Sequence, residues 1–284
     1  MIRLDAATVL LQWAAGGLLF LWVTTRERQV GIGYGWLLRG VYGLMALGAC
    51  AVGAWVDPVP LREASALAVA LAAAGALTVS VVRRKAGVAG ERARVERRTA
   101  RVAAMTGVDR RPDGPDATVP EFPPALDLAA PLLAVPGLVA AGVAAGDPAP
   151  LSVLRVLVGA AFLGAISDGM LLGHWYLVQP GLARRPLLDM VRWTAVLWPF
   201  EVALLLWPIG MGSVLSGSID DGYNGMLAWF WVACAVTTIG LVVVTRAALR
   251  ERYYSAVMAA TGLLYLAILT AFGTDLVARA LLAG

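Results

Sequence analysis

Two acidic residues fall inside stretches of the chain that are otherwise almost entirely apolar. Asp168 lies in the segment 153–176 and Glu201 in the segment 193–215, each long enough to cross a membrane as a helix. A charged side chain near the centre of such a helix costs roughly 2.5–3.5 kcal/mol on insertion scales, so it usually faces the protein interior or a wet cavity. The chemistry that these residues offer is therefore proton binding and release, or hydrogen bonding to a ligand.

The positions of the two acids in their segments predict that they meet. If the segments form an antiparallel hairpin, both carboxyl groups lie about 12 Å from the same membrane interface. No arginine or lysine is expected at that depth, and two neighbouring carboxyls without a cation would hold at least one proton between them. We therefore predict that Asp168 and Glu201 face each other within reach of one bridging water. The alternative is two separate neutral carboxyls that form hydrogen bonds between helices.

Three more polar residues accompany Asp168 on its predicted helix: Ser167, His174 and Tyr176. Ser167 and His174 are seven residues apart and so share one face of a helix, with Asp168 turned about 100° away from it. His174 is the only histidine, so neither a bis-histidine haem nor a histidine-based metal site is predicted within the chain. It is either a hydrogen-bond partner for a quinone or lipid headgroup, or a structural residue of the membrane interface. No catalytic residue and no metal ligand is predicted.

The elements that must position these residues are transmembrane helices. The chain has 284 residues, of which 60% are hydrophobic and 15% charged, with a mean hydropathy of +0.75, whereas soluble domains carry about 25% charge. Apolar stretches near the length of about 20 residues that a spanning helix needs alternate with short arginine-bearing loops. The sequence predicts an all-α polytopic bundle with eight spans, at 7–24, 40–56, 64–82, 127–146, 153–176, 193–215, 225–245 and 254–274.

The distribution of basic residues predicts the orientation of these spans. All but four of the 23 arginine and lysine residues fall in the loops on one side, and loops rich in these residues stay in the cytoplasm. Both termini are therefore predicted to lie outside. Lys85 is the only lysine, and the excess of arginine, alanine and glycine is typical of GC-rich bacterial genomes, so we expect a multi-pass protein of the bacterial inner membrane. The four exceptions are Arg3, Arg62, Arg155 and Arg279.

The predicted loop 83–126 divides the chain into spans 1–82 and spans 127–284. Its first part, up to residue 105, favours a helix with arginines between regularly spaced valines. It is either an amphipathic helix against anionic lipid or a protein partner, or a solvated extension of the preceding span. The remainder, 109–124, is rich in proline and is predicted to be an extended tether. The predicted docking residues are Arg83, Arg84, Lys85, Arg94, Arg97, Arg98 and Arg101.

Two local patterns concern the helices around the acids. Pro199 and Pro208 lie on either side of Glu201, and proline bends a helix, as in the broken helices of transporters. Asp275 and Arg279, one turn apart beyond the last predicted span, are predicted to form an ion pair at the outer interface.

Two functions are compatible with these features. The first is a membrane subunit of a larger respiratory or redox assembly that transports electrons, in which the acids and His174 form a proton- or quinone-handling site. The second is a proton-coupled transporter of a small molecule or ion. The chain is expected to hold no cofactor other than a bound quinone, to bind lipid and other membrane subunits but not nucleic acid, and not to be an enzyme by itself. The arginine-rich loop favours the first function.

Overall fold

The structure is a computed structural model that describes residues 2–107, 120–179 and 181–283. Most of the predicted proline-rich tether, 109–124, lies outside the described residues. The described residues form helices and no strands, which confirms the predicted all-α class. The helices are α1 (Ala6–Thr25), α2 (Ile32–Val56), α3 (Pro60–Val82), α4 (Ala89–Thr106), α5 (Ala129–Ala144), α6 (Ala149–Val178), α7 (Arg185–Leu206), α8 (Met211–Leu215), α9 (Met226–Arg250) and α10 (Tyr254–Leu281), with 3-10 turns at Arg84–Ala86 and Pro124–Leu128.

Seven of the described helices are long and apolar enough to cross a bilayer, as in a multi-pass membrane protein. They are α1, α2, α3, α6, α9, α10 and the continuous segment Pro124–Ala144, which ends in α5. The remaining predicted span, 193–215, corresponds to α7, which is long enough but carries Asp189, Arg192 and Glu201. The predicted number of eight spans and their orientation therefore stay predictions.

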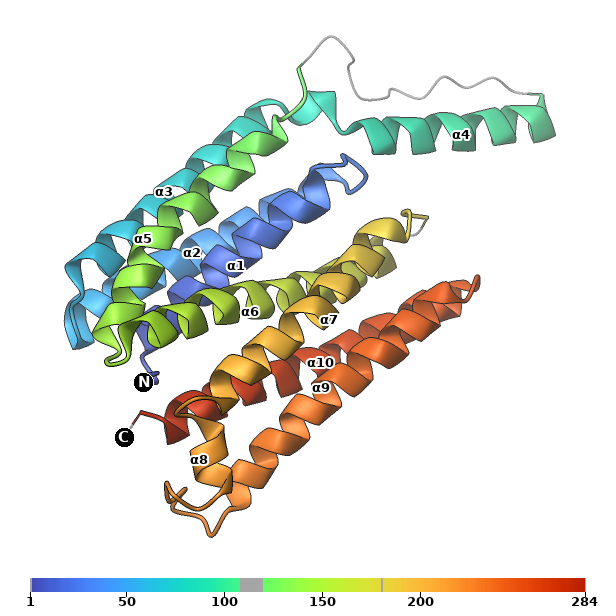
Figure 1. The fold of residues 1–284 in the computed structure, drawn as a ribbon. Helices are drawn as coiled ribbons and strands as arrows, with labels where there is room; N and C mark the ends of the chain where they lie inside the picture. The colour runs from blue at the N-terminus through green and yellow to red at the C-terminus, as the bar shows by residue number, and fades with distance from the viewer. Residues whose placement is uncertain (1, 108–119, 180, 284) are drawn as a thin grey trace.

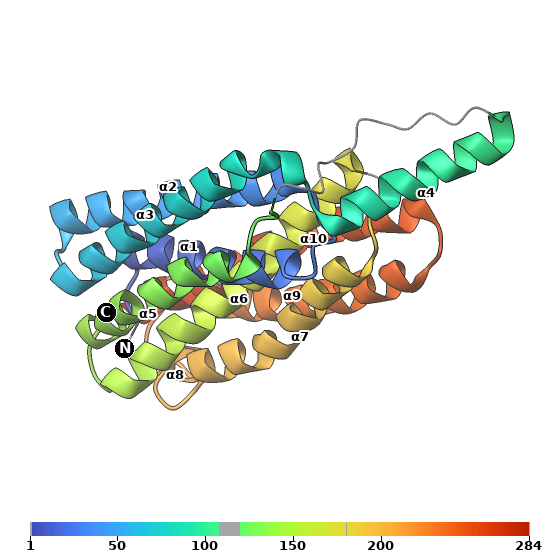
Figure 2. The ribbon, with the colours of Figure 1, turned by 90° about the horizontal axis from the view of Figure 1, so that it is seen from above.

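Helix α6 is the centre of the bundle, and Figures 1 and 2 show helices on either side of it. It packs against α1 and α5 on one side and against α7 and α10 on the other. Helices α2 and α3 complete the first group, and α9 completes the second. The two termini lie close together at one end of the bundle, which we call the terminal end; the opposite end, from which α4 projects, we call the basic end (Figure 1).

The contact between α1 and α6 brings backbone against backbone. A Cβ atom added at Gly16 would lie 1.8 Å from the carbonyl oxygen of Ala160, and one added at Gly164 would lie 2.1 Å from the carbonyl carbon of Gly16. Small residues allow this close approach of membrane helices. The contact fixes the position of α6 relative to α1 between two polar regions, one around Gly159 and the other around Asp168.

Four arginines that the sequence places at span ends or in loops lie inside helices and are buried: Arg39, Arg62, Arg155 and Arg279. At Arg39, Arg62 and Arg279 the helix extends past the predicted span, because an apolar stretch read from hydropathy stops at its first charge, whereas a helix continues when that charge is paired. Arg39 forms a two-pronged ion pair with Asp127, with both N–O distances 2.7 Å. Helix α2 accordingly begins at residue 32 and not at residue 40.

Helix α7 also differs from its predicted span. It begins at Arg185, eight residues before the predicted start, and ends at Leu206. The predicted segment 193–215 joins α7 to the separate short helix α8. Pro199 is accommodated inside α7, and the chain leaves helical conformation at Trp207, immediately before Pro208. This break is the irregularity that the proline pattern predicted for this region.

The arginine-rich arm begins where α3 ends. Gly87 takes a positive φ of 59°, which turns the chain before α4 starts at residue 89. Helix α4 buries none of its residues, and in both views it runs past the basic end of the bundle (Figures 1 and 2). The Glu121 carboxylate anchors its base by forming ion pairs with Arg28, at 3.1 Å, and with Arg92. The predicted helix is therefore present, as a separate element and not as a continuation of α3.

At the terminal end, Asp221 organises the loop that precedes α9. Its carboxylate accepts hydrogen bonds from the backbone N–H groups of Tyr223, Gly225, Leu227 and Ala228, at 2.8–3.3 Å. These bonds, that from Gly225 foremost, hold the pKa of Asp221 below its usual value, because they favour the charged form. Their contribution to stability is present at neutral pH and is lost as the pH falls through this lowered pKa.

Candidate functional site

Asp168 lies in the interior of the bundle, where α6 meets α1 and α2. Its side chain is fully buried, and its Oδ1 atom accepts a hydrogen bond of 2.6 Å from the hydroxyl of Tyr42. Its Oδ2 atom has no hydrogen-bond partner among the described residues. About two turns before Tyr42 in α2, towards the basic end, Tyr34 donates its hydroxyl to the backbone carbonyl of Asp168 at 3.4 Å. Two tyrosines of α2 therefore contact Asp168, Tyr42 at its carboxyl group and Tyr34 at its backbone carbonyl.

Helix α1 shapes the other side of the Asp168 site. A Cβ atom at Gly17 would lie 2.1 Å from the ring of Tyr42, so glycine at this position makes room for that ring. Trp13, one turn before, donates its indole N–H to the hydroxyl of Ser167 at 2.8 Å. The hydroxyl of Ser167 thus holds α6 against α1 beside Asp168.

Glu201 lies in a second polar region, nearer the terminal end. Its carboxyl is buried and has Asp275, Arg279 and Arg155 as its charged neighbours. Asp275 and Arg279 form the predicted ion pair, with 2.7 Å between Arg279 Nε and Asp275 Oδ2. That pair is confirmed; it lies inside α10, which continues to residue 281, and both side chains are fully buried within the bundle. Its predicted location at the outer interface stays a prediction.

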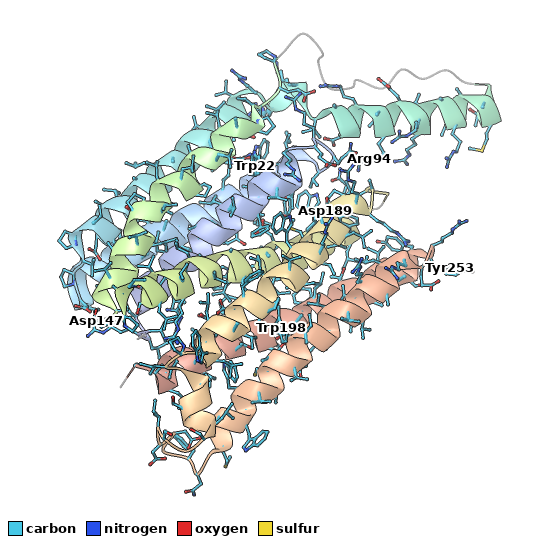
Figure 3. The ribbon with its side chains drawn as sticks, in the orientation of Figure 1. Trp22, Arg94, Asp147, Asp189, Trp198 and Tyr253 are labelled. Atoms are coloured by element: carbon cyan, nitrogen blue, oxygen red, sulfur yellow. The ribbon has the colours of Figure 1, made fainter. Side chains whose placement is uncertain are left out.

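Arg155 joins this second region to the break after α7. Its guanidinium group donates to the backbone carbonyl oxygens of Leu204, at 2.7 Å, and of Ile209, at 2.6 Å. Both carbonyls lie where α7 ends and would otherwise lack a helical donor. About two turns before the end of α7, Trp198 donates its indole N–H to the carbonyl of Ala235 at 3.0 Å and ties α7 to α9 (Figure 3).

The second polar region also contains side-chain atoms without a partner among the described residues. They come from three helices, α1, α7 and α10, and are Gln12 Oε1, Glu201 Oε1, Asp275 Oδ1 and Arg279 Nη2. A Cβ atom at Gly159 would lie 2.8 Å from Gln12 Nε2 and 3.4 Å from Asp275 Oδ1, so the absence of a side chain there gives these groups their space. With two arginines and two acids, the region is balanced in charge.

The structure does not bring Asp168 and Glu201 together as the sequence predicted. Asp168 is hydrogen-bonded to α2, whereas Glu201 lies beside α10. The difference follows from the helix boundaries: because α7 begins at residue 185, Glu201 is sixteen residues from the basic end of α7, whereas Asp168 is ten from that end of α6. At 1.5 Å per residue, the two acids differ in depth by about 9 Å.

The other two predicted site residues lie near the basic end and away from the Asp168 carboxyl. His174 is exposed on the outside of the bundle, where its Nδ1 atom lies 3.1 Å from the hydroxyl of Tyr265 on α10. Tyr176 is buried and donates its hydroxyl to the backbone carbonyl of Ala183 in the turn before α7. Of the five predicted residues, only Ser167 adjoins Asp168 in the described structure.

The predicted docking residues divide into two groups. Arg83 donates to the backbone carbonyl of Glu121 at 3.0 Å and helps to anchor the arm, and Arg94 lies on the side of α4 that faces the bundle (Figure 3). The remaining five are exposed. They are Arg84, Lys85, Arg97, Arg98 and Arg101.

Asp168 differs from the other buried acids that the structure describes. Asp127 is paired with Arg39, Asp275 with Arg279, and Glu201 has two arginines as neighbours. Asp221 accepts four backbone N–H bonds. Only Asp168 among them has neither a cation nor a backbone donor, and its one partner is the hydroxyl of Tyr42. An unpaired buried carboxylate is so costly that the neutral, protonated form is strongly favoured.

Comparison with known proteins adds nothing to this geometry. No protein-family model, no curated protein and no solved structure matches the chain.

Proposed function

We propose that this chain is a proton-handling membrane protein in which Asp168 binds and releases the proton. The observation that carries the proposal is the isolation of this carboxyl, which is fully buried and has no cationic partner among the described residues. A protonated Asp168 would be neutral in the bundle. Loss of the proton would leave a charge that only the Tyr42 hydroxyl solvates, so the proton would pass through the site and the charged form would be short-lived.

Hydroxyl groups lead from Asp168 towards the basic end. Tyr42 contacts the carboxyl directly, Tyr34 lies two turns away on the same face of α2, and Thr24 of α1 adjoins Tyr34. Tyr34 donates to the backbone carbonyl of Asp168 and not to Tyr42, but a hydroxyl both donates and accepts hydrogen bonds, so water bridging the two tyrosines would complete a relay. We propose that protons reach Asp168 along this row.

We propose that the setting of this reaction is a larger respiratory or quinone-linked assembly of which the chain is one membrane subunit. The feature that favours an assembly is α4, which runs past the basic end, buries none of its residues and exposes Arg97, Arg98 and Arg101. An arginine-rich helix of this kind suits an acidic partner subunit. A bound quinone would take its hydrogen bonds from the Asp168 region.

A proton-coupled transporter is the second candidate, and the break between α7 and α8 favours it. Arg155 holds the carbonyls freed by that break, beside Glu201 and the Asp275–Arg279 pair. Interrupted helices next to buried charges are the elements from which transporters build their binding sites. In this reading Asp168 supplies the coupling proton and the second polar region lies next to the substrate.

The proposal is tested by proton flux in vesicles reconstituted with the purified protein. Asp168→Asn keeps the size and hydrogen-bonding capacity of the side chain but carries no exchangeable acid proton. We expect the flux driven by an acid pulse to fall by a factor of about 10² or more, the lower end of what a positioned acid–base group contributes. Glu251→Gln removes an exposed acid at the end of α9 and should leave the flux unchanged.

Two outcomes would overturn the proposal. One is a wild-type flux no greater than that of empty vesicles, measured both alone and with the subunits that co-purify in mild detergent. The other is an Asp168→Asn variant with full flux. Migration of the native protein as a single chain, together with uptake of a substrate, would instead select the transporter over the assembly subunit.

A further inference from the structure

A cleft of about 380 Å³ opens at the basic end between α1 and α7, separate from both buried polar regions. It is lined by Arg26, Arg185, Asp189, Arg192, Trp193 and Val196. Figure 3 shows Asp189 at this end of α7. Three guanidinium groups thus meet one carboxylate, and the lining carries a net charge of +2.

Two of the three arginines of this cleft are positioned by contacts with neighbouring side chains. Arg26 lies over the ring of Trp22, 5.3 Å from its centroid, in a cation–π arrangement. Arg185 forms an ion pair of 3.1 Å with Glu27, in which 73% of the Arg185 side chain stays exposed. Arg192 follows Asp189 by one turn of α7. Each guanidinium keeps donor groups for a further anion, since arginine carries five N–H donors.

The wall of the cleft is apolar on the side nearer the membrane centre. Trp193, Val196 and Phe200 follow one another at intervals of three and four residues along one face of α7, and all three are exposed. The ring of Trp193 is held by edge contact with Phe20 of α1, with 6.0 Å between centroids. Cationic groups at the end of the bundle therefore continue directly into an exposed apolar strip along α7.

We propose that this cleft binds the phosphate of an anionic phospholipid, with an acyl chain along the strip of α7. The arrangement matches such a lipid in order: charge at the level of the headgroups, then apolar surface at the level of the hydrocarbon. Basic pockets at the membrane interface are known to select anionic headgroups in this way. A free phosphate would meet the same arginines, but it would make no use of the apolar strip.

The test is native mass spectrometry of the full chain in a neutral detergent, titrated with phosphatidylglycerol or with phosphatidylcholine. We expect the anionic lipid to bind preferentially, and the double variant R26Q/R192Q to lose that binding by a factor of roughly 10–30, since each interfacial arginine contributes a factor of about five. R246Q/R250Q is the matched control, because it removes two exposed arginines from α9, also at the basic end of the bundle. It should bind phosphatidylglycerol as the wild type does.

Three results would each contradict the proposal. They are equal binding of the two lipids by the wild type, undiminished binding of phosphatidylglycerol by R26Q/R192Q, and an equal loss in the control variant. A competition experiment with inorganic phosphate distinguishes a lipid site from a site for free anions. If it displaces phosphatidylglycerol at similar concentration, the cleft is a site for free anions and not for lipid. If V196N/F200N stays folded and binds phosphatidylglycerol more weakly than the wild type, the apolar strip is confirmed as part of the site.

Discussion

Replacing Arg279 by methionine is expected to leave little folded protein after extraction into detergent. The guanidinium of Arg279 is the ion-pair partner of Asp275, both side chains are fully buried, and the carboxyl of Glu201 adjoins them. Removal of one partner leaves a buried charge without compensation, which costs about 3–5 kcal/mol. That is a large share of the roughly 5–15 kcal/mol by which proteins are stable.

The double variant D275N/R279M separates the effect of the unpaired charge from the effect of the changed shape of the Arg279 side chain. It removes both charges, so it should recover most of the melting temperature that R279M loses, as measured by thermal unfolding monitored by tryptophan fluorescence. R250M removes an exposed arginine from the end of α9 and should melt as the wild type does. If R279M and R250M melt at the same temperature, the ion pair does not stabilise the bundle.

Gly164→Ala is the second substitution with a large expected effect, although it adds a single methyl group. The new Cβ would lie 2.1 Å from the carbonyl carbon and 2.5 Å from the Cα of Gly16. Backbone atoms cannot move aside as a side-chain end can, so α1 and α6 would have to separate. Overpacking of this kind costs roughly 1–3 kcal/mol or more, and it would also shift Asp168 relative to Tyr42.

Gly262→Ala is the matched control, because no atom lies within 4 Å of a Cβ at that position of α10. In a helix, alanine is favoured over glycine by up to about 1 kcal/mol, so this variant should be as stable as the wild type or slightly more so. The two melting temperatures should therefore move in opposite directions. An unchanged melting temperature for Gly164→Ala would mean that α1 and α6 are not in backbone contact.

The helical class and most of the spans could be predicted because they depend on local composition. A run of some twenty apolar residues has few alternatives to a membrane helix, and seven such helices are present among the described residues. The residues at which the helices begin and end could be predicted less well. Arg39, Arg155 and Arg279 each lie inside a helix near a predicted boundary, because Arg39 and Arg279 are paired with buried acids and Arg155 donates to freed backbone carbonyls.

The partners of Asp168 could not be predicted, because they depend on which helices are neighbours. Tyr42 and Gly17 are unremarkable within α2 and α1 until the two helices are packed against α6. The only signal in the sequence was the presence of Tyr34 and Tyr42 on one face of an apolar helix. The pairing of Asp168 with Glu201 was wrong because the predicted depth of Glu201 depended on where α7 begins. That helix begins at Arg185, eight residues before the apolar segment that starts at Trp193.

Infrared spectroscopy of Asp168 tests the central claim most directly, because a protonated carboxyl and a carboxylate absorb at different frequencies. In membranes at neutral pH, the difference between wild-type and Asp168→Asn spectra should contain the C=O stretching band of a carboxylic acid. Tyr42→Phe should shift that band by removing the hydrogen bond of 2.6 Å. If the difference spectrum contains carboxylate bands and no carboxylic acid band, Asp168 is ionised, and the proposal that it carries a proton through the bundle is wrong.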